Sequence, residues 1–248
     1  MNLKSLALFL SLTVGGFVHA STCDKKVYLT FDTGNMSVAQ DVATVLKRQD
    51  VKATFFVANE KTFRDDFALD NSWKPFWQSL VKDGHAFGSH TLNHTYWQKD
   101  GIHQTVWVKS QFGKSAGKLR EFNTEQMCSE IKASDLRFKD LTGRHLDPIW
   151  RAPGGKISPR LIQMGKICGE QHIAWAKAGF MGDELPSETY PNHLLLSRAL
   201  DGLKDGDITM AHLGIWSRHD PWAPAVLEPL ILGLKERGFC FETIPEKK

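Results

Sequence analysis

The stretch Lys26-Val27-Tyr28-Leu29-Thr30-Phe31-Asp32 predicts a strand, because it is rich in β-branched and aromatic residues. Residues 37–50 follow it with apolar side chains on one helical face, which predicts a helix. The same alternation repeats along the chain, with strands expected at 53–57, 85–89, 148–151, 172–176 and 207–212, helices at 73–82, 124–141, 159–167 and 193–203, and a final helix and strand. This order predicts an α/β fold with a parallel sheet that is closed or nearly closed.

The N-terminal residues 1–20 have the order of a secretory signal peptide: Lys4, an apolar run over 6–18, and Val18-His19-Ala20 before Ser21. The alternatives are a buried helix or a membrane anchor, but the run is shorter than the roughly 20 residues that a membrane span needs. We therefore expect an exported protein, periplasmic or extracellular, without a stable membrane span after cleavage. Residues 21–248 are then expected to form a single domain.

Composition narrows the class of protein. Hydrophobic residues make up 42% and charged residues 24% of the 248 residues, as in an ordinary globular protein. The formal net charge of +3 is too small to indicate nucleic acid as a partner. Four cysteines in an exported chain allow three full pairings. Cys23 precedes the first predicted strand and Cys240 lies in the last, so these two become neighbours if the sheet closes.

Residues that can carry chemistry follow the predicted strands. Asp32 ends the first, His90 follows the third, Arg151 follows the fourth and His212 ends a late one. In parallel α/β folds the carboxyl ends of the strands form the rim of the active site. This placement favours an enzyme over a purely structural protein.

The segment His90-Thr91-Leu92-Asn93-His94 spaces two imidazoles four residues apart, so on a helical turn both can chelate one cation. The same spacing also occurs on polar surfaces, but here the pair directly follows an apolar strand. The zinc-peptidase pattern is excluded because no glutamate follows His90.

Five spaced motifs carry a resemblance to a known family: Leu29-Thr30-Phe31-Asp32, Ala53-Thr54-Phe55-Phe56-Val57, residues 84–94, Arg151-Ala152-Pro153 and Met210-Ala211-His212. Together they resemble the polysaccharide deacetylases, carbohydrate esterase family four, from about residue 26 to residue 244. The resemblance implies a distorted, incompletely closed (β/α) barrel of about seven parallel strands. It also implies removal of acetyl groups from glycans with a divalent metal, for which zinc is expected.

Carried over residue by residue, the resemblance makes His90 and His94 metal ligands, Asp32 the general base, Arg151 the partner that orients Asp32, and His212 the general acid. Hydrolysis of an acetamide needs such a base for the attacking water and such an acid for the departing amine. A backbone N–H near Gly154, after Pro153, would stabilise the oxyanion. The alternatives are that Asp32 caps a helix, Arg151 anchors a surface carboxylate and His212 is a core histidine.

The chain departs from the family pattern at three places. The second aspartate of the first motif, a metal ligand in the family, is replaced by Thr33, so the third ligand is Thr33 itself, held weakly or through water, or else Asp32. Gly154-Gly155 stands where an aromatic residue usually follows Pro153, which predicts a wider or differently shaped groove. The fourth motif is not recognisable, and Asp183 or Glu184 is expected to substitute as the partner of His212.

The expected substrate is an acetylated glycan such as peptidoglycan or a chitin-like polymer. Sugar rings bind on aromatic faces, and candidates follow the predicted strands at Trp97, Trp107, Trp216 and Trp222, although core packing is an alternative for each. The main hypothesis is a metal-dependent N-acetylglucosamine deacetylase. The alternatives are a glycan-binding protein that lost turnover when Thr33 replaced the aspartate, and a different amide hydrolase. The polymer, the acetyl linkage and the oligomeric state do not follow from the sequence.

Overall fold

The structure, a computed structural model, describes Cys23 and residues 25–244. The predicted signal peptide, residues 1–20, lies outside the described residues. Within the described part, no helix is long and apolar enough to span a membrane.

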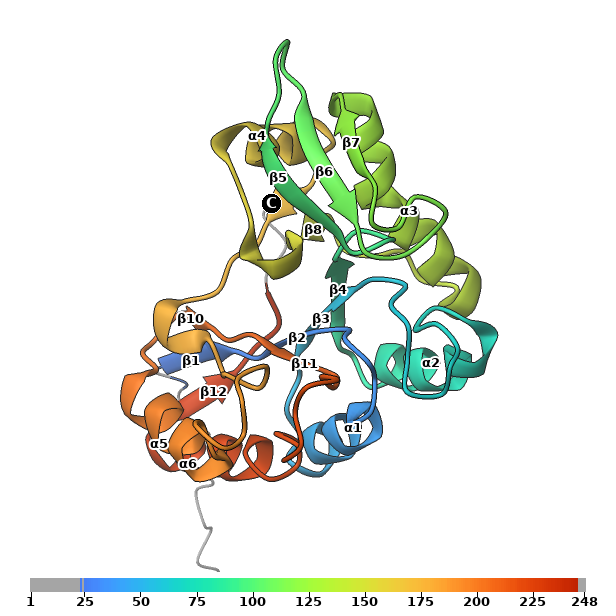
Figure 1. Cartoon of the computed structure of the whole chain (residues 1–248). Helices are drawn as coiled ribbons and strands as arrows, with labels where there is room; N and C mark the ends of the chain where they lie inside the picture. The colour runs from blue at the N-terminus through green and yellow to red at the C-terminus, as the bar shows by residue number, and fades with distance from the viewer. Residues whose placement is uncertain (1–22, 24, 245–248) are drawn as a thin grey trace, which may run out of the picture.

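Two parallel sheets form the centre of the molecule (Figure 1). The larger has the order β11 (Ala211–His212), β2 (Thr30–Asp32), β3 (Thr54–Val57), β4 (Ala86–Ser89), β8 (Ile149–Trp150) and β9 (Gln171–His172). The smaller contains β10 (Asp207–Ile208), β1 (Lys25–Tyr28) and β12 (Phe239–Phe241). Since β1 runs into β2 and β10 into β11 with matching register, the parallel strands correspond to the seven that the resemblance predicts.

The barrel is incompletely closed, as expected. After β9 the chain approaches the opposite edge, where the Ala176 N–H donates to the carbonyl of Ile208 and Phe180 forms an isolated bridge with Met210. These contacts do not extend into a ladder. A small apolar cluster, made of Phe56, Ile149, Ile173 and Ile244, also packs apart from the main core.

Within the residues that the structure describes, six α-helices cover the sheets: α1 (Ala39–Arg48), α2 (Lys74–Lys82), α3 (Thr124–Thr142), α4 (Pro159–Ile167), α5 (Asn192–Gly202) and α6 (Leu227–Glu236). Short 3₁₀ turns η1 (Asn71–Trp73), η2 (Pro153–Gly155) and η3 (Lys177–Gly179) lie between them. Helix α1 is typical, because its apolar positions Val42, Val45 and Leu46 recur at helical spacing and are all buried. The central strands β3 and β4 are buried at every position, as expected for parallel strands that are covered on both faces.

An additional antiparallel sheet lies between the strand predicted at 85–89 and the helix predicted at 124–141, where the sequence indicated no element. It consists of β5 (Thr95–Asp100), β6 (Val106–Ser110) and β7 (Leu119–Phe122), and it stands beyond the end of β4, beside α3 and α4, in Figure 1. Val106 and Val108 on its inner face are buried in a cluster with residues of α3 and α4. This sheet forms one side of the candidate site, because β5 begins directly after His94.

Two disulfides tie the chain together in the described part. Cys23 is joined to Cys240, the pair expected from closure of the sheet, and Cys128 to Cys168. The second links α3 to the end of α4, beneath the antiparallel sheet. All four cysteines are thereby paired.

Candidate active site

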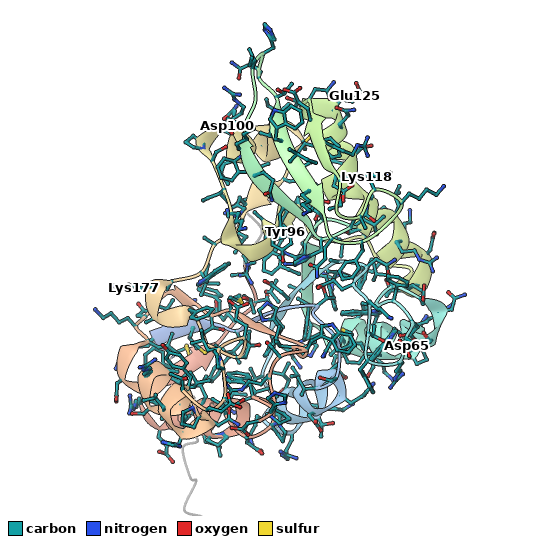
Figure 2. All side chains as sticks on the ribbon, in the orientation of Figure 1. Asp65, Tyr96, Asp100, Lys118, Glu125 and Lys177 are labelled. Carbon is teal, nitrogen blue, oxygen red and sulfur yellow. A yellow bond between two sulfur atoms is a disulfide. The ribbon has the colours of Figure 1, made fainter. Side chains whose placement is uncertain are left out.

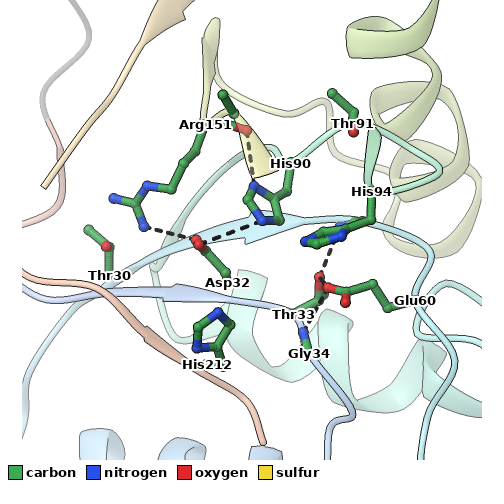
Figure 3. A network of polar contacts seen from close by, with 12 residues as sticks. Thr30, Asp32, Thr33, Gly34, Glu60, His90, Thr91, His94, Arg151 and His212 are labelled. Atoms are coloured by element: carbon green, nitrogen blue, oxygen red, sulfur yellow. Dashed lines mark hydrogen bonds and ion pairs between the residues drawn. The ribbon is translucent and has the colours of Figure 1, made fainter. Parts of the chain in front are cut away.

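Four of the predicted catalytic and metal residues converge because the strands that carry them are parallel. Asp32 ends β2 and lies in register with His212, which ends β11. His90 follows β4 and Arg151 follows β8, and Ser89 of β4 pairs with Trp150 of β8. Figure 3 shows these side chains as one polar network at the carboxyl end of the sheet.

Asp32 is a buried carboxylate held by a buried arginine. Arg151 Nη1 donates to Asp32 Oδ1 at 2.8 Å, and Arg151 Nε donates to the carbonyl of Ile173 at 3.2 Å. The guanidinium also lies over the ring of Phe56, 4.1 Å from its centroid. Burial would raise the pKa of Asp32, but the charge of Arg151, supported by the charge of His212 and the hydrogen bond from Arg151, lowers it below its ordinary value. Asp32 is therefore ionised and has Oδ2 left to accept a proton.

His212 has its own carboxylate partner, Asp183, as the sequence suggested. Asp183 Oδ2 accepts the backbone N–H of His212 at 2.6 Å, and both carboxylate oxygens lie 3.1 to 3.2 Å from Nδ1. Burial works to lower the pKa of His212, but the charge and hydrogen bond of Asp183 raise it to about 10. The imidazole is therefore protonated at neutral pH, and its Nε2 proton is available for donation.

The two histidines of the predicted metal pair are held in defined tautomers. His90 Nδ1 donates to the carbonyl of Arg151 at 3.0 Å, and His94 Nδ1 lies 2.7 Å from Gln111 Oε1. The ring centroids of the pair are 4.9 Å apart, and burial lowers the pKa of His90 to about 4. Because each Nδ1 carries its proton toward an acceptor, each Nε2 keeps a lone pair, the arrangement found in histidine metal ligands.

With this geometry in place, comparison with known proteins assigns the family. Residues 19–173 match the family model described as polysaccharide deacetylase. The chain belongs to the polysaccharide deacetylase family. It is thereby placed among hydrolases that act on carbon–nitrogen bonds other than peptide bonds, and the predicted resemblance is confirmed.

Individual relatives differ in their similarity to the chain. The chain is 41% identical to a putative polysaccharide deacetylase, YheN, of Bacillus subtilis, over 90% of this chain and 68% of that protein. The chain is 22% identical to a peptidoglycan-N-acetylglucosamine deacetylase of Bacillus cereus, over 90% of this chain and 88% of that protein. Among solved structures it resembles a family 4 acetyl xylan esterase from Clostridium thermocellum in complex with cobalt (TM-score 0.66, 21% identity, 88% of each chain). It also resembles a family 4 pseudoenzyme from Bacillus anthracis (TM-score 0.62, 17% identity, 89% of this chain and 64% of that one). The structural matches support the barrel and leave activity open.

The donor set of this polysaccharide deacetylase fits a divalent cation in its chemistry. Two imidazoles with free Nε2 atoms and the carboxylate of Asp32, whose Oδ2 lies 3.6 Å from His90 Nε2, face one another. Nitrogen and carboxylate oxygen are the ligands that zinc takes at catalytic sites. Among residues 25–244, however, no three His, Cys, Asp or Glu side chains are gathered closely enough to hold a metal as they stand, so binding requires ligands to draw together.

Thr33 is buried beside the histidines, but its hydroxyl already donates one hydrogen bond and accepts another. It donates to Glu60 Oε1 at 2.6 Å and accepts the backbone N–H of Ala58 at 3.2 Å. Glu60 is a buried carboxylate from the loop after β3, and Figure 3 shows it next to Thr33 and beneath His94. The sequence analysis missed Glu60, because no family motif or regular spacing connects it to the other site residues.

Of the two alternatives for Gly154-Gly155, a wider or a differently shaped groove, the structure supports the second, because aromatic side chains from elsewhere occupy the freed space. A Cβ on Gly154 would lie 2.9 Å from the ring of Tyr96, and one on Gly155 would lie 2.6 Å from the ring of Trp175. Both glycines have positive φ, and Pro153 before them is buried. Tyr96 comes from the start of β5 and is labelled in Figure 2 where the antiparallel sheet meets the parallel one.

The predicted sugar-binding tryptophans lie in different environments. Trp216 is 62% exposed after β11 and remains a candidate for the groove. Trp222 is buried, and Trp97 packs against the cluster between the antiparallel sheet and α4, so core packing explains both. Trp107 on β6 is partly buried, with the Lys99 ammonium 5.6 Å from its ring centroid.

Proposed function

We propose that the protein is a metal-dependent hydrolase that removes N-acetyl groups from N-acetylglucosamine residues of a cell-wall or extracellular glycan such as peptidoglycan. The acceptance of a divalent cation, most simply zinc, is part of this proposal. So is export to the periplasm or the exterior, which rests on the signal-peptide pattern of residues 1–20.

One observation carries the proposal: Asp32 and His212 are neighbours in register whose surroundings drive their pKa values in opposite directions. The pKa of Asp32 is lowered, so this carboxylate is a base at neutral pH, while Asp183 keeps His212 protonated. Hydrolysis of an amide needs a neighbouring base and acid whose pKa values are shifted in opposite directions in this way. A protein that only binds glycan has no use for it.

In this scheme each residue has one task. Asp32 takes a proton from the attacking water, and Arg151 holds the carboxylate in place through Oδ1. His212 gives its Nε2 proton to the amine nitrogen as the carbon–nitrogen bond breaks, so acetate and a free amino sugar result. The Gly154 N–H is a candidate donor to the oxyanion of the tetrahedral intermediate. His90 and His94 would hold a divalent cation, which would supply Lewis acidity for the hydrolysis.

A groove of about 400 Å³ beside the histidine pair is a candidate for the glycan chain. It is lined by Tyr96, Gln98, Lys109, Ser110, Gln111, Gly117 and Lys156. Gln111 also holds His94, and Lys156 lies over the ring of Tyr96 at 5.3 Å, so the groove adjoins the catalytic residues. The two lysines favour a polymer with acidic substituents, such as the lactyl or peptide carboxylates of peptidoglycan.

The test is incubation of the purified mature protein with chitooligosaccharides and with muropeptides, followed by mass measurement of the products. We expect loss of acetyl mass from at least one substrate, abolished by a chelator and restored by zinc. In His212→Ala, turnover should disappear while affinity for the glycan persists. If no acetylated glycan loses acetyl mass, the proposed activity is wrong.

The replacement of the family aspartate by Thr33 motivates the second candidate, a glycan-binding protein on the same barrel without turnover. Elemental analysis of the protein purified without added metal separates the two. Near-stoichiometric zinc supports the enzyme. A metal-free protein that binds glycan and releases no acetate after zinc addition supports the binding protein.

A further inference from the structure

We propose that Glu60 supplies the carboxylate ligand of the metal site in place of the family aspartate that Thr33 replaces. This inference rests on the proposed metal dependence and concerns which residue completes the site. The metal set would then be His90, His94 and Glu60, with Asp32 left free as the base.

The position of Glu60 is fixed by its backbone. The Glu60 carbonyl accepts the N–H of Ala68 at 2.8 Å, and the neighbouring Asn59 donates its N–H to the carbonyl of Leu92 at 2.8 Å. Leu92 lies within the segment that joins His90 to His94. The loop that carries the carboxylate is therefore hydrogen-bonded directly to the loop that carries the imidazoles, so their relative placement is defined by main-chain contacts.

The two carboxylate oxygens of Glu60 have different surroundings. Oε1 accepts the Thr33 hydroxyl at 2.6 Å and the Gly34 N–H at 2.8 Å. Oε2 accepts no hydrogen bond from the part of the chain that the structure describes. Only 8% of the residue is exposed, but Oε2 is not among the fully enclosed polar atoms that lack a partner, so this oxygen remains accessible to a bound cation.

Glu60 places a carboxylate next to the histidines, and Figure 3 shows it beneath His94. The Nδ1 atoms of His90 and His94 face the Arg151 carbonyl and Gln111 Oε1, so the Nε2 lone pairs of both imidazoles are free for a metal. Two histidines and a glutamate are a ligand set that catalytic zinc sites use.

This arrangement also explains Thr33. Its side chain is too poor a ligand to replace an aspartate, but its hydroxyl donates to the carboxylate that stands in. The carboxylate that the first motif lacks is therefore supplied by Glu60, in the loop after β3, which is hydrogen-bonded to Thr33. Thr33 is then a positioning residue that orients a ligand.

The experiment measures metal affinity, independently of turnover. Metal-free full-length protein is titrated with zinc by calorimetry, and with cobalt by visible absorption, which reports the ligand set. Glu60→Gln keeps the acceptor for Thr33 and Gly34 but removes the charge, so we expect the zinc dissociation constant to rise by on the order of 100-fold. Glu184→Gln, which removes a carboxylate near His212 and Tyr96, is the matched control and should change it less than about threefold.

A double variant that moves the carboxylate from position 60 to position 33 makes the test specific. Thr33→Asp combined with Glu60→Gln returns the carboxylate to the family position, and we expect zinc affinity within about tenfold of the wild type. This variant also covers the possibility that Glu60→Gln alone folds poorly. The proposal is overturned if wild type and Glu60→Gln bind zinc equally, or if the relocated carboxylate restores nothing. If the wild type binds no zinc, metal dependence itself fails, so the two failures are distinguishable.

Discussion

Replacing Asp183 with asparagine should lower the pKa of His212, so that an imidazole that is protonated at neutral pH becomes one that titrates near neutrality. Asparagine has nearly the same shape, and its amide oxygen can still accept the His212 backbone N–H that Asp183 Oδ2 accepts at 2.6 Å. What disappears is the buried negative charge 3.1 Å from Nδ1. Without it, burial dominates and the pKa of His212 should fall from about 10 to its ordinary 6.5 or below.

The magnitude follows from linkage between protonation and folding. A pKa raised from 6.5 to about 10 corresponds to at most about 5 kcal/mol of stability, at about 1.4 kcal/mol per pKa unit. Because the folded-state pKa is the higher one, this stability is fully present below pH 6.5 and is lost as the pH rises toward about 10. The wild-type free energy of unfolding should therefore fall by up to about 1.4 kcal/mol per pH unit in that window, relative to Asp183→Asn.

Two assays measure this effect on metal-free protein. Nuclear magnetic resonance titration of the His212 imidazole gives its pKa directly, and urea unfolding between pH 6 and 10 gives the stability difference between wild type and variant. Glu184→Gln is the control, because Glu184 acts on His212 only through its charge and contributes least to the shift. The reasoning is refuted if His212 keeps a pKa near 10 in Asp183→Asn, or if the stability difference does not depend on pH.

Two further predictions concern stability near the site. Arg151→Met should lower the free energy of unfolding by about 3 to 5 kcal/mol, because it leaves the buried Asp32 carboxylate unpaired. Arg151→Lys should lower it less, because the positive charge remains even though the bond to the Ile173 carbonyl is lost. Gly155→Ala should lower the free energy of unfolding, measured in urea, by about 2 to 4 kcal/mol, since the new Cβ meets both a positive φ and the ring of Trp175. Gly169→Ala also lies at positive φ but has open space around it, so it should lower the free energy of unfolding by only about 1 to 2 kcal/mol. Equal losses within either pair would contradict these explanations.

Much of the fold and the catalytic set could be predicted from the sequence, because both depend on local pattern. Buried parallel strands are apolar runs, and the residues at their ends meet by topology, which placed Asp32, His90, Arg151 and His212 together. The antiparallel sheet β5 to β7 was missed because its outer face is polar, so its strands do not stand out from a polar connection.

The errors at the site have a different cause. Glu60 meets Thr33 across 27 positions of sequence, through two loops whose relative placement depends on the whole barrel. Likewise, the absence of an aromatic residue at Gly154 predicted a wider or differently shaped groove, but the sequence did not indicate that Tyr96 and Trp175 approach from separate elements and occupy the space. Contacts of this kind depend on tertiary packing, and a motif comparison within one segment does not contain them.

The most direct test of the account is a crystal structure of the protein soaked with zinc, with anomalous data collected at the zinc edge. We predict one anomalous peak at the carboxyl end of the sheet, within about 2.0 to 2.2 Å of the Nε2 atoms of His90 and His94 and of a Glu60 carboxylate oxygen. Asp32 should remain paired with Arg151 and outside the coordination sphere. A peak whose carboxylate ligand is Asp32, or no peak at the histidine pair, would contradict the account.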